Sequence, residues 1–124
     1  MRVIIAGSRG LADYDLVLRA IEGFKQPITE IFSGHANGID RLGERYAYAH
    51  RIPIKSFPYP KGHGKRGGPM RNKQMALQAQ ALIAIWDGQS KGTLDMITQA
   101  KRHGLIVHVH RTDHEARQGE MDLK

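Results

Sequence analysis

Three short turns rich in glycine and hydroxyl side chains are the segments best suited to bind an anion. They are Gly7 to Gly10, Ser33 to Asp40, and Asp87 to Thr93. Glycine lets the backbone approach a phosphate closely, and the amides and dipole of a following helix provide positive potential. The predicted ligand-binding residues of these turns are Gly7, Ser8, Arg9, Gly34, Asn37, Asp40, Gly88, Gly92 and Thr93.

Arg71 and Asn72 stand at the predicted start of a helix, directly after a basic loop. A guanidinium group binds phosphate or carboxylate through two parallel hydrogen bonds, and an asparagine amide both donates and accepts. We therefore expect both residues to contact the same ligand as the glycine turns. The alternative is that they are ordinary surface residues of a helix start.

Asp40 and Asp95 are the carboxylates placed to bind sugar hydroxyls or to act in acid–base chemistry. Each also lies near a predicted helix start, where a negative charge stabilises the helix by roughly 0.3 to 1 kcal/mol. Glu44 follows one turn after Asp40, and we expect it to form a surface pair with Arg41 or Arg45.

Neither a metal site nor a standard nucleotide-phosphate loop is expected. Three histidines and an aspartate, His108, His110, Asp113 and His114, lie at the end of the last predicted strand without an organised partner downstream, so no bound metal is predicted. The first turn reads G-S-R-G instead of G-x-G-x-x-G, and no G-x-x-x-x-G-K-[ST] sequence occurs. Because these motifs are absent, an NAD-dependent oxidoreductase or an ATPase is a less favoured function, and no cofactor is predicted.

The elements that must position these residues alternate strictly between strand and helix. Strands are predicted at 3–6, 29–33, 52–57, 81–86 and 105–109, with helices starting near 13, 38, 69 and 92. Continuous apolar runs, such as Val3 to Ala6, suit strands that are buried on both faces. The alternation predicts an α/β fold, a Rossmann-like doubly wound five-stranded parallel sheet with helices on both faces. The turns that follow the strands would then meet at one edge of the sheet.

The length of 124 residues predicts a single domain, residues 1–112, followed by a polar tail, residues 113–124. The chain has no cysteine, which excludes disulfides, thiolate metal sites and a cysteine nucleophile. No apolar run approaches the roughly 20 residues needed to cross a bilayer, and the first residues do not resemble a secretion signal. We therefore expect a soluble cytoplasmic protein without a membrane partner.

The formal net charge of +7 indicates an anionic partner. No acidic residue lies between Glu44 and Asp87, whereas that stretch is rich in lysine and arginine: Arg45, Arg51, Lys55, Lys61, Lys65, Arg66, Arg71 and Lys73. The charge alone does not distinguish a nucleotide from a nucleic acid, or either from a solvated basic face.

Four of these segments, in this order, resemble the SLOG superfamily, a Rossmann-like group that joins SMF/DprA proteins with LOG-type enzymes. They are GSRG, SGHANGIDRLGERYA, GPMRNKQMA and DGQSKGTLDM, and the resemblance extends from residue 2 to about residue 110. It is greatest to the YspA/YpsA-related branch. The resemblance implies a domain that binds a nucleotide or nucleotide-derived ligand, such as a nucleoside monophosphate or an ADP-ribose relative, and this is our first hypothesis. It also implies a homodimer.

The LOG enzymes of this superfamily are phosphoribohydrolases, and their motifs imply roles for Arg71 and for the segment from Asp87 to Met96. Met96 stands where these enzymes have a catalytic glutamate, and a methionine cannot act as a base. Asp95 lies next to it. The second hypothesis is therefore an N-glycosidic hydrolase with Arg71 and Asp95 as catalytic residues, and the third is DprA-like binding of nucleic acid through the basic stretch.

Overall fold

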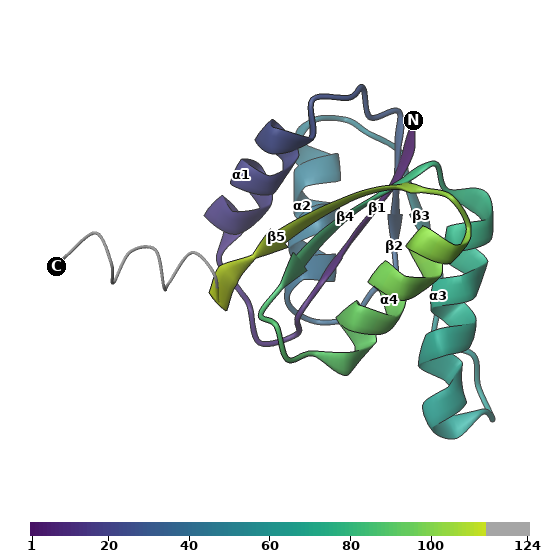
Figure 1. The fold of residues 1–124 in the computed structure, drawn as a ribbon. Coiled ribbons are helices and arrows are strands. Elements are labelled where there is room, and N and C mark those ends of the chain that lie inside the picture. The colour runs from purple at the N-terminus through teal and green to yellow at the C-terminus, as the bar shows by residue number, and fades with distance from the viewer. Residues whose placement is uncertain (114–124) are drawn as a thin grey trace, which may run out of the picture.

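The computed structural model describes residues 1–113, which form a five-stranded parallel sheet between two pairs of helices (Figure 1). In chain order the elements are β1 (Arg2–Gly7), α1 (Tyr14–Phe24), β2 (Glu30–Ser33), α2 (Ile39–Ala49), β3 (Ile54–Ser56), a 3₁₀ helix (Gly64–Arg66), α3 (Gly67–Gln78), β4 (Ala81–Trp86), α4 (Lys91–Arg102) and β5 (Ile106–Arg111). Helices α1 and α2 cover one face, and α3 and α4 cover the other. The predicted Rossmann-like α/β arrangement is confirmed. Of the predicted tail, residues 113–124, all residues after Asp113 lie outside the described part of the chain, His114 included.

The strands lie in the order β3-β2-β1-β4-β5, and each neighbouring pair is parallel. The chain adds β2 and β3 on one side of β1 and then crosses over to add β4 and β5 on the other. As a result α1, which follows β1, and α4, which follows β4, lie on opposite faces of the sheet. In open α/β sheets this reversal between two central strands is the place where ligands bind, at the carboxyl ends of the strands.

The two central strands are buried on both faces, because their apolar side chains alternate between two separate hydrophobic cores. In β1, Val3 and Ile5 pack with α1 and α2, whereas Ile4 and Ala6 pack with α3 and α4. β4 alternates in the same way, with Ile83 in the first core. Burial on both sides fixes the register of the sheet, and with it the positions of the turns that follow each strand.

Some predicted boundaries are wrong by one or two residues. Helix α3 begins at Gly67 instead of Pro69, and the 3₁₀ helix Gly64–Arg66 lies within the stretch predicted as loop. Pro69 is tolerated there because the first amides of a helix have no intrahelical acceptor. Strand β5 continues to Arg111, because it stays paired with β4 as far as Trp86. None of the helices within residues 1–113 has the length and apolar character needed to span a bilayer.

Candidate ligand-binding site

A cavity of about 700 Å³ opens at the carboxyl ends of β1 and β4. Its walls come from the β1–α1 turn and from the starts of α2, α3 and α4, and its size is typical of small-molecule sites. The sequence-predicted residues that line it are Gly7, Ser8, Arg9, Asp40, Arg71, Asn72, Gly92, Thr93 and Asp95. The sheet topology thus brings residues from distant parts of the chain to one site.

Three predicted residues, Gly34, Asn37 and Gly88, are not part of the lining. Asn37 is exposed on the β2–α2 turn, and Gly88 adopts a φ of +81° in the β4–α4 turn. The Gly34 carbonyl accepts a hydrogen bond from Arg71 Nη1 at 3.0 Å. A Cβ at Gly34 would lie 3.0 Å from both the Arg71 guanidinium and Asp40 Oδ2. Glycine at this position lets the guanidinium and the carboxyl pack closely.

The start of α4 faces the cavity. Ser90 caps the helix, because its Oγ accepts from the Thr93 amide at 3.4 Å and lies 3.1 Å from Thr93 Oγ1. The first amides of a helix have no intrahelical acceptor. The residues that carry them here, Lys91 and Gly92, both line the cavity. This wall therefore combines hydrogen-bond donors with the positive end of the helix dipole.

Asp87 holds the β4–α4 turn in this shape. Its Oδ1 accepts from the amides of Gln89 and Ser90, each at 2.8 Å. These amides, with the Ser8 hydroxyl, lower the pKa of the Asp87 carboxyl below its usual range. Ser8 is 1% exposed, and its Oγ also accepts from the Asp87 amide at 3.2 Å. The Ser8 hydroxyl, which we expected to contact a ligand, is thus engaged in joining two turns.

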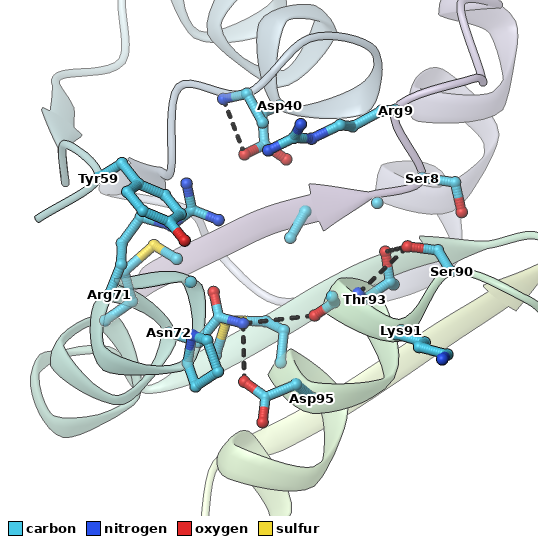
Figure 2. A pocket seen from close by; sticks show the side chains of 18 of the residues that line it. Ser8, Arg9, Asp40, Tyr59, Arg71, Asn72, Ser90, Lys91, Thr93 and Asp95 are labelled. Atoms are coloured by element: carbon cyan, nitrogen blue, oxygen red, sulfur yellow. Dashed lines mark hydrogen bonds between the residues drawn. The ribbon is translucent and has the colours of Figure 1, made fainter. Parts of the chain in front are cut away.

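The opposite wall carries a buried carboxyl. Asp40, in the first turn of α2, is 5% exposed and accepts from the Ala36 amide at 3.3 Å. Burial raises the pKa of Asp40 to about 6, although the Arg71 charge and nearby amides act in the other direction. In Figure 2, Asp40 and Arg9 lie across the cavity from Asn72 and Asp95. The cavity therefore has a donor-rich wall and a second wall with a carboxyl group that titrates near neutral pH.

Asn72 connects α3 to α4. Its Nδ2 donates to Asp95 Oδ2 at 2.9 Å and to the Gly92 carbonyl at 3.3 Å. Both bonds are drawn between the two helices in Figure 2. Because its amide nitrogen is engaged in this way, Asn72 orients Asp95, and its expected role in clamping a phosphate stays a prediction.

Arg71 lines the cavity from α3 and has unused hydrogen-bonding capacity. Its Nη1 bonds to Gly34, and its guanidinium carbon lies 5.7 Å from the centre of the Tyr59 ring. Its Nε is buried and has no hydrogen-bond acceptor within residues 1–113. A buried donor without a partner costs roughly 1 to 3 kcal/mol, and such groups need a specific explanation, often a functional one.

Sequence reasoning missed Tyr59, which lines the cavity together with Lys65 of the basic loop. Both belong to the basic, proline- and glycine-rich loop that precedes α3. The Tyr59 hydroxyl donates to the Gly64 carbonyl, and its ring packs on Gly67. The signal available in the sequence was a single tyrosine between two prolines in a long basic loop, which indicates mobility or function but assigns neither to one side chain.

The expected surface pairing of Glu44 with Arg41 or Arg45 is wrong. Glu44 Oε2 accepts from Ser33 Oγ at 2.6 Å and lies 2.8 Å from His35 Nδ1, and its side chain is 18% exposed. Glu44 therefore stabilises the β2–α2 turn from within. Over residues 1–113, no three histidine, cysteine, aspartate or glutamate side chains are grouped so as to hold a metal ion, and His114 lies outside that range.

Comparison with known proteins found a family match for the first part of the chain. Residues 1–59 match the family described as YspA, cpYpsA-related SLOG family. The matched segment contains two of the three glycine turns and ends at Tyr59. Searches of the curated proteins and of the solved structures found no match. The match over residues 1–59 supports an assignment of this part of the chain to the SLOG superfamily, in its YspA-related branch.

Proposed function

We propose that this chain binds a phosphorylated nucleoside, such as a nucleoside monophosphate or an ADP-ribose relative, in the cavity at the ends of β1 and β4. Membership of the SLOG superfamily suggests nucleotide-related binding. The observation that carries the proposal is that the start of α4 lines one cavity together with Arg9, Lys65 and Lys91. A helix start in a cavity that also carries cationic side chains favours a phosphate group.

The phosphate is assigned to the start of α4, on the amides of Lys91 and Gly92 and the Thr93 hydroxyl. Asp40, Asp87 and Asp95 line the cavity and would repel a phosphate, but the oxygens of Asp40 and Asp95 accept hydrogen bonds from sugar hydroxyls. A phosphorylated nucleoside satisfies both kinds of group, whereas inorganic phosphate would use only one. The cavity also has room for more than a phosphate, at about 700 Å³.

We propose that the cavity binds its ligand without cleaving it. Met96, at the position where the resemblance places a catalytic glutamate, is buried and lines the cavity. Asp95, the nearest carboxylate in sequence, has one oxygen bonded to Asn72. The arrangement of these two residues favours recognition of a ligand over cleavage of its glycosidic bond.

Isothermal titration calorimetry with AMP, ADP-ribose and unphosphorylated adenosine tests this function. We expect heat of binding from a phosphorylated compound and at least tenfold weaker binding of adenosine, since a hydrogen bond to a charged group contributes roughly 1.5 to 3 kcal/mol. Lys91→Ala should weaken AMP binding by roughly three- to tenfold. The matched control is Lys101→Ala, which removes the same charge from the last turn of α4 and should leave affinity unchanged.

Wild-type protein that gives no heat with any phosphorylated nucleoside would contradict the proposal. Equal losses of AMP affinity in Lys91→Ala and Lys101→Ala would show that the overall charge of the protein determines binding, and not the start of α4. Chromatography of the same mixtures for free adenine determines whether hydrolysis accompanies binding.

A further inference from the structure

Tyr59 is the single aromatic side chain among the residues 1–113 that line the cavity. Figure 2 shows Tyr59 and Arg71 at one end, with Ser8, Ser90 and Thr93 at the other. The end near Tyr59 is therefore away from the start of α4, where we assign the phosphate. Tyr59 is 43% exposed, so a substantial part of it is open to a ligand.

The contacts around Tyr59 fix the orientation of its ring. Its hydroxyl donates to the Gly64 carbonyl, and Arg71 lies over the ring, with its guanidinium carbon 5.7 Å from the ring centre. On another side the ring packs so closely on Gly67 that a Cβ there would overlap it. A side chain already held in place loses little conformational entropy when a ligand packs on it.

The chemistry of this end suits a nucleobase. Bases pack on aromatic rings and on arginine guanidinium planes, and the interaction tolerates any base. Pro69 and Met75, from the same helix as Arg71, add apolar surface to the cavity. The polar wall at the start of α4 offers no comparable aromatic surface among its lining residues Ser90 to Thr93.

We propose that the cavity holds its ligand in one orientation, with the base against Tyr59 and Arg71 and the phosphate at the start of α4. The ligand class is therefore an intact nucleotide, as distinct from a sugar phosphate. This inference rests on the function proposed above. The competing interpretation is that Tyr59 only fastens the loop before α3, in which case its loss would affect all ligands alike.

The test compares AMP with ribose 5-phosphate, which lacks the base, by calorimetry. Tyr59→Ala should weaken AMP binding by roughly tenfold or more, as expected for loss of one base–aromatic contact. The same variant should change the affinity for ribose 5-phosphate by less than about twofold, since the phosphate contacts remain. Tyr59→Phe keeps the ring and should bind both ligands within about threefold of wild type.

Tyr48→Ala is the matched control, because Tyr48 is 85% exposed and lies outside the cavity lining. It should bind both ligands like wild type. An equal loss of AMP and ribose 5-phosphate in Tyr59→Ala would overturn the inference, and so would unchanged binding of AMP. Circular dichroism of each variant establishes that it is folded.

If Tyr59→Ala does not fold, nuclear Overhauser effects in the wild-type complex answer the same question. We expect effects between the adenine H2 or H8 proton of AMP and a tyrosine ring assigned to Tyr59 by comparison with Tyr59→Phe. Their absence would overturn the inference. If the wild-type protein binds AMP no more tightly than ribose 5-phosphate, the proposed orientation of the ligand is wrong but the proposed function stands. If it binds neither compound, the proposed function is wrong as well.

Discussion

The β2–α2 turn and the β4–α4 turn share a composition of glycines and hydroxyl side chains, but they contribute opposite chemistry to the cavity. In the first turn, Ser33 and His35 bond inward to Glu44, and the side chain that reaches the cavity is the carboxyl of Asp40. In the second turn, Asp87 bonds to its own turn amides, which leaves the start of α4 facing the cavity. The first turn thus provides a carboxyl acceptor, whereas the second provides amide donors beside the Asp87 carboxylate, which also lines the cavity.

The acidic residues of the two turns show the same contrast in their pKa values. Asp87 accepts two short hydrogen bonds from amides, and its pKa is lowered. Asp40 accepts one longer bond at 3.3 Å and is buried, and its pKa is raised to about 6. The direction of each shift follows from the balance between amide donors and burial. Turn composition alone therefore does not determine whether a turn favours an anion.

Gly38→Ala should break the β2–α2 turn and have the largest effect. Gly38 caps α2 with φ +78° and ψ −128°, and a Cβ there would lie 2.5 Å from the Arg9 carbonyl oxygen. Backbone strain and the clash together should lower the free energy of unfolding by about 3 to 5 kcal/mol, measured by urea denaturation. Gly10→Ala is the control, because a Cβ at Gly10 meets nothing within 4 Å. Similar stability losses in the two variants would contradict the strain argument.

The positions of these turns could be predicted from the sequence, because they depend on local patterns. The run Ala81 to Trp86 is apolar throughout and was predicted as a strand with the bounds that the structure shows. The sequence predicts a helix start near residue 13, and Asp13 caps α1 there, since its side chain accepts from the Asp15 amide at 2.9 Å. The parallel order then follows from strict alternation and short crossovers, so the placement of most candidate residues around one cavity was predictable.

The roles of several residues within that cavity could not be predicted, because they depend on contacts between distant segments. The Ser8 hydroxyl bonds to Asp87, and the Asn72 amide bonds to Asp95. Neither bond leaves a periodic signal in the sequence. Tyr59 lies on a segment without hydrophobic periodicity, and its place in the cavity depends on the close contact with Gly67 that the 3₁₀ helix and the start of α3 create.

Asp40→Asn should change how stability depends on pH. Because the pKa of Asp40 is raised from 3.8 to about 6, the folded protein binds more protons than the unfolded chain between these values. The titration of Asp40 therefore lowers the free energy of unfolding by about 2 to 3 kcal/mol as the pH rises from about 4 to about 6. The asparagine variant lacks this decline, so it should gain stability relative to wild type over the same range, measured by urea denaturation at pH 4 to 7.

Asp87→Asn is the matched control for this titration. The pKa of Asp87 is lowered, so its contribution to stability is present above its unfolded value of 3.8 and is lost only as the pH falls further. Above pH 5 the profile of Asp87→Asn should therefore run parallel to that of wild type. An Asp40→Asn profile that also ran parallel from pH 4 to 7 would show that burial does not hold a proton on Asp40.

Gly92→Ala should have the smallest effect on stability and tests the donor-rich turn directly. Gly92 is the second residue of α4, and a Cβ there meets nothing within 4 Å. Alanine favours helix over glycine by up to about 1 kcal/mol, so the free energy of unfolding should stay equal or rise slightly. The added methyl group would nevertheless stand beside the amides assigned to the phosphate, and AMP binding should weaken by roughly three- to tenfold. A variant that was folded and bound AMP as tightly as wild type would place the phosphate away from the start of α4, and the contrast between the two turns would then not explain where the anion binds.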